Sequence, residues 1–214
     1  GFAPHIDDIG ARRHQRVAVG DGGGCVGEGA GGIEAVRAGI RQVVLITNPE
    51  NKLTASHFST DPVLEAALTE KDKPELLATL RALAAMADVT SLPQAQPRGL
   101  GHAVLCGRHV VGRCPFAVLL PDDVIDAEPT ALQQMLNVFA EVNGPVLLVE
   151  RVPRSDVSRY GIIAAEPVRD GVLRVTDLVE KPDPDKAPSE FAVIGRYILT
   201  PDIFELLEQT QVGA

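Results

Sequence analysis

The sequence predicts an α/β fold, in which a mixed, mostly parallel sheet carries helices on both faces. Short apolar runs alternate with segments of helical spacing, and this alternation is typical of parallel strands joined by crossover helices. The runs are apolar throughout, as expected of strands buried on both faces. The clearest of them are 42–47, 116–120 and 145–149.

The other elements of the first 150 residues follow the same rhythm. Asp61 and Pro62 supply a cap and a first-turn proline for one helix. A short strand at 88–92 leads into a helix that continues to Val111. The predicted helices of this part are 34–40, 61–69, 74–86, 100–111 and 130–142.

Beyond residue 150, strand-like segments follow one another with almost no helix between them. This change predicts a mixed or antiparallel extension that joins the edge of the parallel sheet. The strands are expected at 162–165, 172–179 and 191–199, with a Pro-rich exposed loop at 182–188 and a last helix at 201–208.

Length and composition favour one globular domain over residues 34–214. The net charge of −9 and the pI near 5.0 argue against a nucleic acid polymer or an anionic membrane surface as partner. No apolar run approaches the roughly 20 residues of a membrane span, and the cysteines have no zinc spacing. Because three cysteines cannot all pair, we expect a reducing cytoplasm, and the negative net charge does not exclude a small anionic ligand.

Residues 1–33 differ in composition from the rest of the chain. Seven glycines fall within 21–32, and residues 7–32 show neither helical nor strand periodicity. Such a segment loses much chain entropy on ordering and buries little surface in return, so we expect it to be aberrant or disordered and predict no strand in it. A phosphate-binding loop is a weaker interpretation, because no Gly-Lys-Ser/Thr follows the glycines.

Gly99 and Gly101 open the helix that follows the 88–92 strand. Without a Cβ at these positions, a planar ring or a phosphate can approach the main chain and meet the free N–H groups of the helix start. A nucleotide cradle and an ordinary Gly-rich turn both fit this pattern.

Asp122 and Asp123 follow the 116–120 strand, at the carboxyl edge where ligands of α/β sheets bind. Adjacent carboxylates are costly unless a cation neutralises them, and oxygen ligands beside a nucleotide suit Mg²⁺. We favour a metal site over a plain Asp turn, with Asp122 as the better ligand because it is nearer the strand.

The second half of the chain carries further candidate site residues. Gly161 leaves open backbone beside Tyr160 and suits a sugar face, although a hairpin turn explains it equally well. Glu180 and Lys181 end a strand with an acceptor and a cation, which could hold sugar hydroxyls and a phosphate or form a surface ion pair. Gly195 permits close approach within a strand.

These features belong to six short motifs that occur in order along residues 34–214. The motifs are Gln94, Gly99-Leu100-Gly101-His102-Ala103, Leu120-Pro121-Asp122-Asp123, Tyr160-Gly161, Glu180-Lys181-Pro182 and Val193-Ile194-Gly195-Arg196-Tyr197. Together they resemble the bacterial UTP:glucose-1-phosphate uridylyltransferases, a branch of the sugar nucleotidylyltransferase superfamily.

The resemblance implies a Rossmann-like, three-layer α/β/α nucleotide-diphospho-sugar transferase fold. It also implies a reaction in which glucose 1-phosphate attacks the α-phosphorus of UTP, giving UDP-glucose and pyrophosphate. On the nucleotide side, it assigns uracil to Gln94 and the backbone around Gly101, with Gly99 and His102 as further nucleotide-binding residues, and Mg²⁺ to Asp122.

On the sugar side, the resemblance assigns Gly161, Glu180 and Gly195 to glucose. Lys181 would be the catalytic residue, a cation on the sugar phosphate. Guanylyl or adenylyl specificity is a minor alternative to the uridylyl specificity. Self-association as a homo-oligomer is implied in the same way.

The sequence departs from that family in residues 1–33. Family members open with a strand and a Gly-rich loop that carries Gly-Thr-Arg and a downstream Pro-Lys, and residues 1–33 contain neither motif. We expect that a frameshift altered this segment, and that a C-terminal portion of the family is missing after Ala214. The chain is therefore expected to be an enzyme with impaired uridylyl transfer or, alternatively, a catalytically dead fragment that at most binds nucleotide-sugar.

Overall fold

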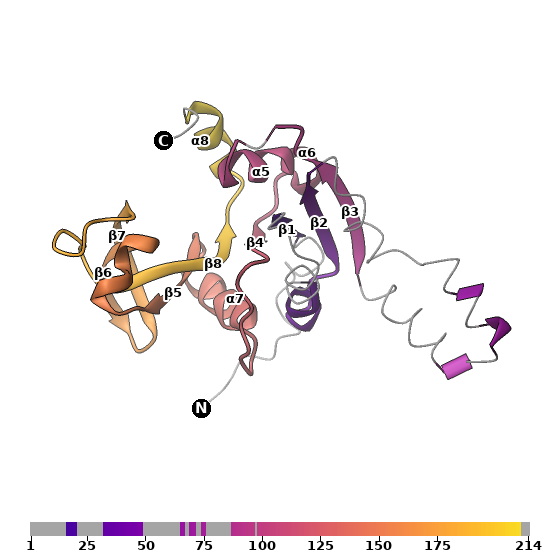
Figure 1. The fold of residues 1–214 in the computed structure, drawn as a ribbon, viewed down its shortest axis with the longest axis horizontal. Coiled ribbons are helices and arrows are strands. Elements are labelled where there is room, and N and C mark those ends of the chain that lie inside the picture. The colour runs from indigo at the N-terminus through magenta and orange to yellow at the C-terminus, as the bar shows by residue number, and fades with distance from the viewer. Residues whose placement is uncertain are drawn as a thin grey trace. The chain divides into compact units, whose positions relative to one another are not determined.

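The computed structural model describes residues 16–20, 32–48, 65–66, 69–71, 74–75, 87–96 and 98–210. Two compact units make up the chain (Figure 1). Unit 2 is the continuous segment Ile125–Ile198, whereas unit 1 comprises the residues up to Val124 together with those from Leu199 onward.

Unit 1 contains a sheet of parallel strands in the order β3-β2-β1-β4. The strands are β1 (Arg16–Gly20), β2 (Gln42–Thr47), β3 (Asp88–Pro93) and β4 (Phe116–Leu119). The apolar side chains of β2 and β4 are buried, as the sequence predicted for both segments. All four strands run in one direction, so their carboxyl ends lie at one edge of the sheet.

The prediction that residues 1–33 contain no strand is wrong at β1. This strand pairs in parallel with β2 on one side and with β4 on the other. Each neighbour presents a row of main-chain N–H and C=O groups, and a strand inserted between them satisfies both rows. Five residues suffice for this, too few to show a period within a Gly-rich segment, so periodicity missed the strand.

A helix over 32–37 precedes β2, close to the predicted span of 34–40. It ends at Gly39, whose φ of +85° lies in the left-handed region. Gly39 N–H donates to Val36 O, and Ile40 N–H donates to Ala35 O, both at 2.9 Å. This pair of bonds is the Schellman arrangement, so the predicted glycine stop is confirmed.

The helix predicted to continue to residue 111 is interrupted at Gly107. It forms α5 (Leu100–Cys106) and, after one turn residue, α6 (Arg108–Val111). Gly107 is buried, and a Cβ there would lie 3.3 Å from Val104 O, so the tight junction requires a small residue. Ala103 on α5 packs in one apolar cluster with Ile46 of β2.

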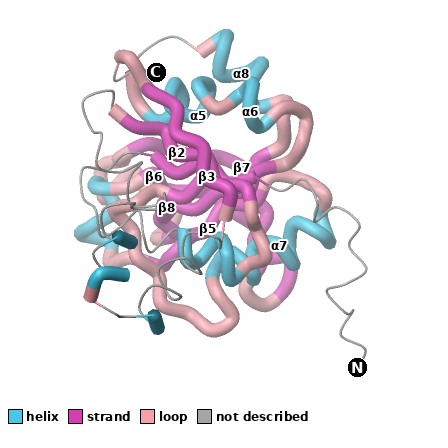
Figure 2. The backbone as a smooth tube through the Cα atoms, turned by 90° about the vertical axis from the view of Figure 1, so that its right-hand side faces the viewer, coloured by secondary structure: helices cyan, strands magenta, loops and turns pink. Residues whose placement is uncertain are grey.

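A last helix, α8 (Ile203–Gln209), belongs to unit 1 and confirms the predicted C-terminal helix. Figure 2 shows it beside α5, with which it is in contact. Phe204 of α8 stacks on Phe116 of β4, with 5.1 Å between ring centroids. This aromatic pair anchors α8 to the sheet.

Unit 2 is built on antiparallel strands. They are β5 (Val146–Arg151), β6 (Gly161–Arg169), β7 (Val172–Glu180) and β8 (Phe191–Leu199), whose last residue belongs to unit 1. β8 pairs with β5 and β6, and β6 pairs with β7. The antiparallel extension is confirmed, but the apolar run at 145–149 belongs to it and not to the parallel strands, because short apolar runs carry no information on direction.

The helix α7 (Ala131–Val142) and the short 3-10 helix η3 (Arg154–Arg159) complete unit 2. Thr130 caps α7 through a capping box: its hydroxyl accepts from Gln133 N–H at 3.2 Å, and its own N–H donates to Gln133 Oε1 at 3.0 Å. The predicted helix over 130–142 is confirmed.

One further prediction is only partly correct, and two predicted helices are largely untested. The Pro-rich segment 182–188 is only partly an exposed loop, because Pro182 and Ala187 are buried, Ala187 against Val157 and Ile162. The helices predicted over 61–69 and 74–86 lie largely outside the described residues. None of the helices in the described part of the chain has the length and apolarity that crossing a membrane requires.

Candidate active site

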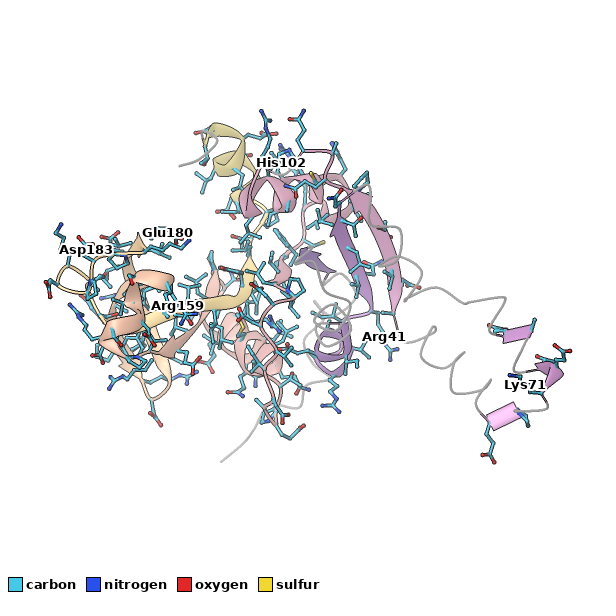
Figure 3. All side chains as sticks on the ribbon, viewed as in Figure 1. Arg41, Lys71, His102, Arg159, Glu180 and Asp183 are labelled. Carbon is cyan, nitrogen blue, oxygen red and sulfur yellow. The ribbon has the colours of Figure 1, made fainter. Side chains whose placement is uncertain are left out.

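Gln94 stands at the carboxyl end of β3 and connects three parts of unit 1. Its N–H donates to Thr47 O at 2.8 Å, which ties its main chain to the end of β2. Its side-chain Nε2 lies 3.2 Å from Gly99 O and 2.9 Å from His102 Nδ1. The predicted nucleotide residues Gln94, Gly99 and His102 therefore form one hydrogen-bonded group, and Figure 3 shows His102 on α5.

Gly99 and Gly101 have different structural roles. Gly99 is the N-cap of α5, with φ 89° and ψ 178°, a conformation that essentially only glycine adopts, and a Cβ there would meet nothing within 4 Å. A Cβ on Gly101 would lie 2.9 Å from Leu207 Cδ2, so α8 packs closely against this position. Open space for a ligand next to the missing Cβ is present at Gly99, whereas Leu207 fills it at Gly101.

Asp122 lies at the same edge of the sheet as Gln94. The strand register places Leu119 level with Ser91, so Asp122 and Gln94 each stand three residues beyond aligned positions. Two strands lie between β3 and β4, so the carboxyl ends of these two strands are about 14 Å apart at the usual interstrand spacing. One extended ligand, rather than one small group, is needed to contact both.

In unit 2, the hairpin of β6 and β7 brings together the motifs at 160–161 and 180–182. Gly161 is the register partner of Glu180, and a Cβ on Gly161 would lie 3.1 Å from Glu180 Oε2. The main-chain N–H of Lys181 donates to Tyr160 O at 3.0 Å. Figure 3 shows Glu180 at the end of this hairpin.

Lys181 occupies the left-handed region with a φ of 47°, which is uncommon for a residue with a side chain. Its Nζ lies 3.5 Å from Glu180 Oε1, and the two side chains are 62% and 68% exposed. An ion pair this exposed contributes little to stability, so both charged groups remain available to a ligand.

Gly195 is buried within β8. It stands three residues after Ala192, which is the register partner of Ile162 near the start of β6. Because β6 and β8 are antiparallel, Gly195 lies beyond the first residue of β6, at the end of the sheet where Glu180 also lies. The guanidinium of Arg196, itself buried, donates to Gly195 O at 3.2 Å.

Sequence reasoning missed two features of the site. The bond between Gln94 and His102 joins residues eight positions apart across a loop, and no periodicity reports such a contact. The half-buried thiol of Cys106, 4.0 Å from His102 Nδ1, was not predicted to be near the site either. The spacing of His102 and Cys106, four residues apart on one helix face, is the one signal that could have indicated it.

Comparison with known proteins supplies the family. The nucleotidyl transferase family model matches residues 33–213. The chain belongs to the nucleotidyl transferase family. A relative in Bacillus subtilis, a UTP–glucose-1-phosphate uridylyltransferase, is 41% identical over 181 residues, which are 85% of this chain and 62% of the relative. The chain thus spans less than two thirds of the length of that relative.

Solved structures are similar as well. A UDP-glucose pyrophosphorylase complexed with UDP-glucose is 30% identical, with a TM-score of 0.81 over 93% of this chain and 81% of that one. A UTP-bound enzyme of the same name from Acinetobacter baumannii is 32% identical, with a TM-score of 0.84 over 92% of this chain and 78% of that one. The predicted family and the Rossmann-like α/β fold are confirmed.

Nucleotidyl transferases of this family generally use a divalent metal ion. Among the described residues, no three His, Cys, Asp or Glu side chains gather into a metal-binding group. The donors present are the exposed carboxylate of Asp122 and the half-buried Asp123 beside it. They fit Mg²⁺, which binds through one or two carboxylates and keeps water or phosphate oxygens as its other ligands.

Proposed function

We propose that this nucleotidyl transferase is a UTP:glucose-1-phosphate uridylyltransferase of impaired activity, which converts UTP and glucose 1-phosphate into UDP-glucose and pyrophosphate. The observation that carries the proposal is that Gln94 and Asp122 follow β3 and β4 at one carboxyl edge, each three residues beyond aligned strand positions. Gln94 would act as a polar contact for the base, and Asp122 as the anionic group that holds the metal ion bound to the phosphates. The names of the Bacillus relative and of the two solved structures support the same substrates.

In the proposed mechanism, unit 1 binds UTP. The Gln94 side chain and the main chain at Gly99 bind uracil, beside His102. Asp122 would hold Mg²⁺, which supplies charge neutralisation of the phosphates when it is bound. Gly101 allows Leu207 of α8 to pack against α5, the helix that carries His102.

Unit 2 binds glucose 1-phosphate. Glu180 accepts hydrogen bonds from sugar hydroxyls, and Gly161 and Gly195 allow the sugar to approach the main chain. Lys181 places its ammonium on the sugar phosphate. In the proposed reaction, an oxygen of glucose 1-phosphate attacks the α-phosphorus of UTP, and pyrophosphate leaves. Catalysis then consists of positioning and charge stabilisation rather than covalent chemistry by the protein.

A second candidate function is nucleotide-sugar binding without turnover. It is favoured by the absence of Gly-Thr-Arg and Pro-Lys from residues 1–33, because the resemblance assigns triphosphate contacts to those motifs. Binding elsewhere on the protein does not replace contacts made in the transition state. Under this alternative, UDP-glucose binds but no pyrophosphate is formed.

A coupled pyrophosphate assay separates the two functions. UTP, glucose 1-phosphate and Mg²⁺ are supplied together, with ATP or GTP replacing UTP in parallel reactions and with Asp122→Asn as the variant. Pyrophosphate release with UTP that is lost in the variant supports the enzyme. UDP-glucose binding by calorimetry without release supports the inactive binder, and neither signal refutes both. We also propose that the protein acts in the cytoplasm, where nucleoside triphosphates are available and free thiols such as Cys106 stay reduced.

A further inference from the structure

The hydrogen bonds around Gln94 fix which way its side-chain amide faces. Gly99 O can only accept a hydrogen bond, so the Gln94 atom 3.2 Å from it must be the NH₂ group. The same nitrogen lies 2.9 Å from His102 Nδ1, which must therefore accept as well. Neutral His102 consequently carries its proton on Nε2.

Cys106 is a second neighbour of the His102 ring nitrogen. Its Sγ lies 4.0 Å from the same His102 Nδ1. Burial raises the pKa of the Cys106 thiol, with an opposing, smaller effect from a main-chain hydrogen bond. The thiol form carries an S–H, a weak donor, which is compatible with an accepting Nδ1.

Because the NH₂ group of Gln94 faces Gly99 O and His102 Nδ1, its carbonyl oxygen Oε1 faces away from them. Its Oε1 receives no hydrogen bond from any residue in the described part of the chain. The main chain cannot move the group, because Gln94 N–H is held by Thr47 O. Gln94 thus presents a carbonyl oxygen, an acceptor only, from a half-buried position at the sheet edge.

We propose that His102 is a positioning residue that sets base specificity, by holding the Gln94 amide so that Oε1 meets the N3–H of uracil. This inference rests on the proposed function, in which Gln94 contacts the base. Cytosine has the size of uracil but carries a lone pair at N3, which faces Oε1 unfavourably. The Gln94 Oε1 atom therefore accepts a hydrogen bond from uracil but repels the N3 lone pair of cytosine. Both the attraction and the repulsion favour UTP over CTP.

The test compares UTP and CTP binding in variants of the full chain. His102→Phe keeps a ring but removes the acceptor at Nδ1, so the Gln94 amide can turn its NH₂ toward cytosine N3 after giving up only the Gly99 bond. His102→Asn restores an acceptor close to the Nδ1 position. His109→Phe makes the same substitution at an exposed position of α6 and serves as the matched control.

Calorimetry on the unaltered chain is expected to show tighter binding of UTP than of CTP. His102→Phe should lower the ratio of the two affinities by about fivefold to tenfold, the effect of losing one hydrogen bond that orients a polar group. His102→Asn and His109→Phe should keep the ratio within about twofold of its original value. A thermal melt of each variant controls for folding.

The outcomes separate this inference from the proposed function. If the unaltered chain prefers UTP but His102→Phe keeps that preference, or His102→Asn loses it equally, the inference is wrong and the proposed function stands. If the unaltered chain does not prefer UTP, both are wrong. A ¹⁵N NMR spectrum of neutral His102 adds a readout that needs no nucleotide: an unprotonated Nδ1 supports the assignment, and a protonated Nδ1 overturns it.

Discussion

Replacement of Gly161 by alanine tests whether the β6–β7 hairpin end binds the sugar. An ideal Cβ on Gly161 would lie 3.1 Å from Glu180 Oε2 and 3.7 Å from Leu178 Cδ2. The first distance is shorter than an ordinary van der Waals contact, so the Glu180 carboxylate must move by a few tenths of an ångström or rotate away. The second distance is ordinary, so the apolar neighbour stays in place.

The magnitude follows from what a displaced carboxylate loses. A hydrogen bond from a sugar hydroxyl to a charged acceptor contributes about 1.5–3 kcal/mol, or roughly a 10- to 100-fold change in affinity. Glu180 is 68% exposed and can partly readjust, so we expect the lower end, about a tenfold loss for UDP-glucose. Stability should change little, because alanine is favoured over glycine within a strand by about 0.5–1 kcal/mol and this offsets the close contact.

The assay is calorimetric titration with UDP-glucose, paired with urea unfolding of the same samples. Gly144→Ala is the matched control, since a Cβ there would meet nothing nearer than Val142 O at 3.8 Å. Weaker binding with unchanged unfolding in Gly161→Ala alone supports the reasoning. Affinity within about twofold of the unaltered chain would refute the role of Glu180, whereas a large loss of stability would show that the hairpin cannot adapt.

Three further predictions concern unit 1. Phe204→Ala removes a side chain that is 2% exposed and should lower the free energy of unfolding by about 3–5 kcal/mol in urea denaturation. Leu206→Ala, at a residue that is 58% exposed, should change it by less than about 0.5 kcal/mol. Equal effects of the two substitutions would contradict the packing of α8. Asp122→Asn should weaken Mg²⁺-dependent UTP binding but leave metal-free binding unchanged, and an equal loss in both titrations would argue against a metal ligand. Because burial raises the pKa of Cys106, its alkylation should rise with pH over a higher range than that of a cysteine peptide, as mass spectrometry can measure; coinciding profiles would contradict the burial.

The parts of the fold that the sequence predicted are those that local pattern determines. Continuous burial makes β2 and β4 apolar throughout, and the Gly39 stop is a local conformational requirement. β1 escaped prediction because its position depends on the pairing groups of two neighbours, which lie far away in the chain. The direction of β5 could not be predicted for the same reason, because it is set by antiparallel pairing with β8.

The same distinction between local pattern and distant contacts applies to the residues of the candidate site. Asp122 and Glu180 could be found because strand ends are marked by a change from apolar to charged residues. The orientation of the Gln94 amide could not, because it depends on a carbonyl and a ring nitrogen that reach it only after the loop has closed. The sequence gives the identity of each side chain, whereas the direction in which an amide presents its donor and its acceptor depends on contacts that form only in the folded protein.

The Gly99-Leu100-Gly101-His102 segment shows why a short motif can have several physical causes. The backbone of Gly99, in a conformation open to glycine alone, directs a carbonyl that accepts from Ala103 N–H at 3.2 Å and from Gln94 Nε2 at the same distance. Gly101 is small because Leu207 packs against it, and His102 contributes its ring nitrogen. The conformation of Gly99 and the ring nitrogen of His102 therefore both orient the Gln94 amide, whereas the small size of Gly101 allows α8 to pack against α5. Substitution at Gly99 or His102 should therefore act on nucleotide binding through Gln94.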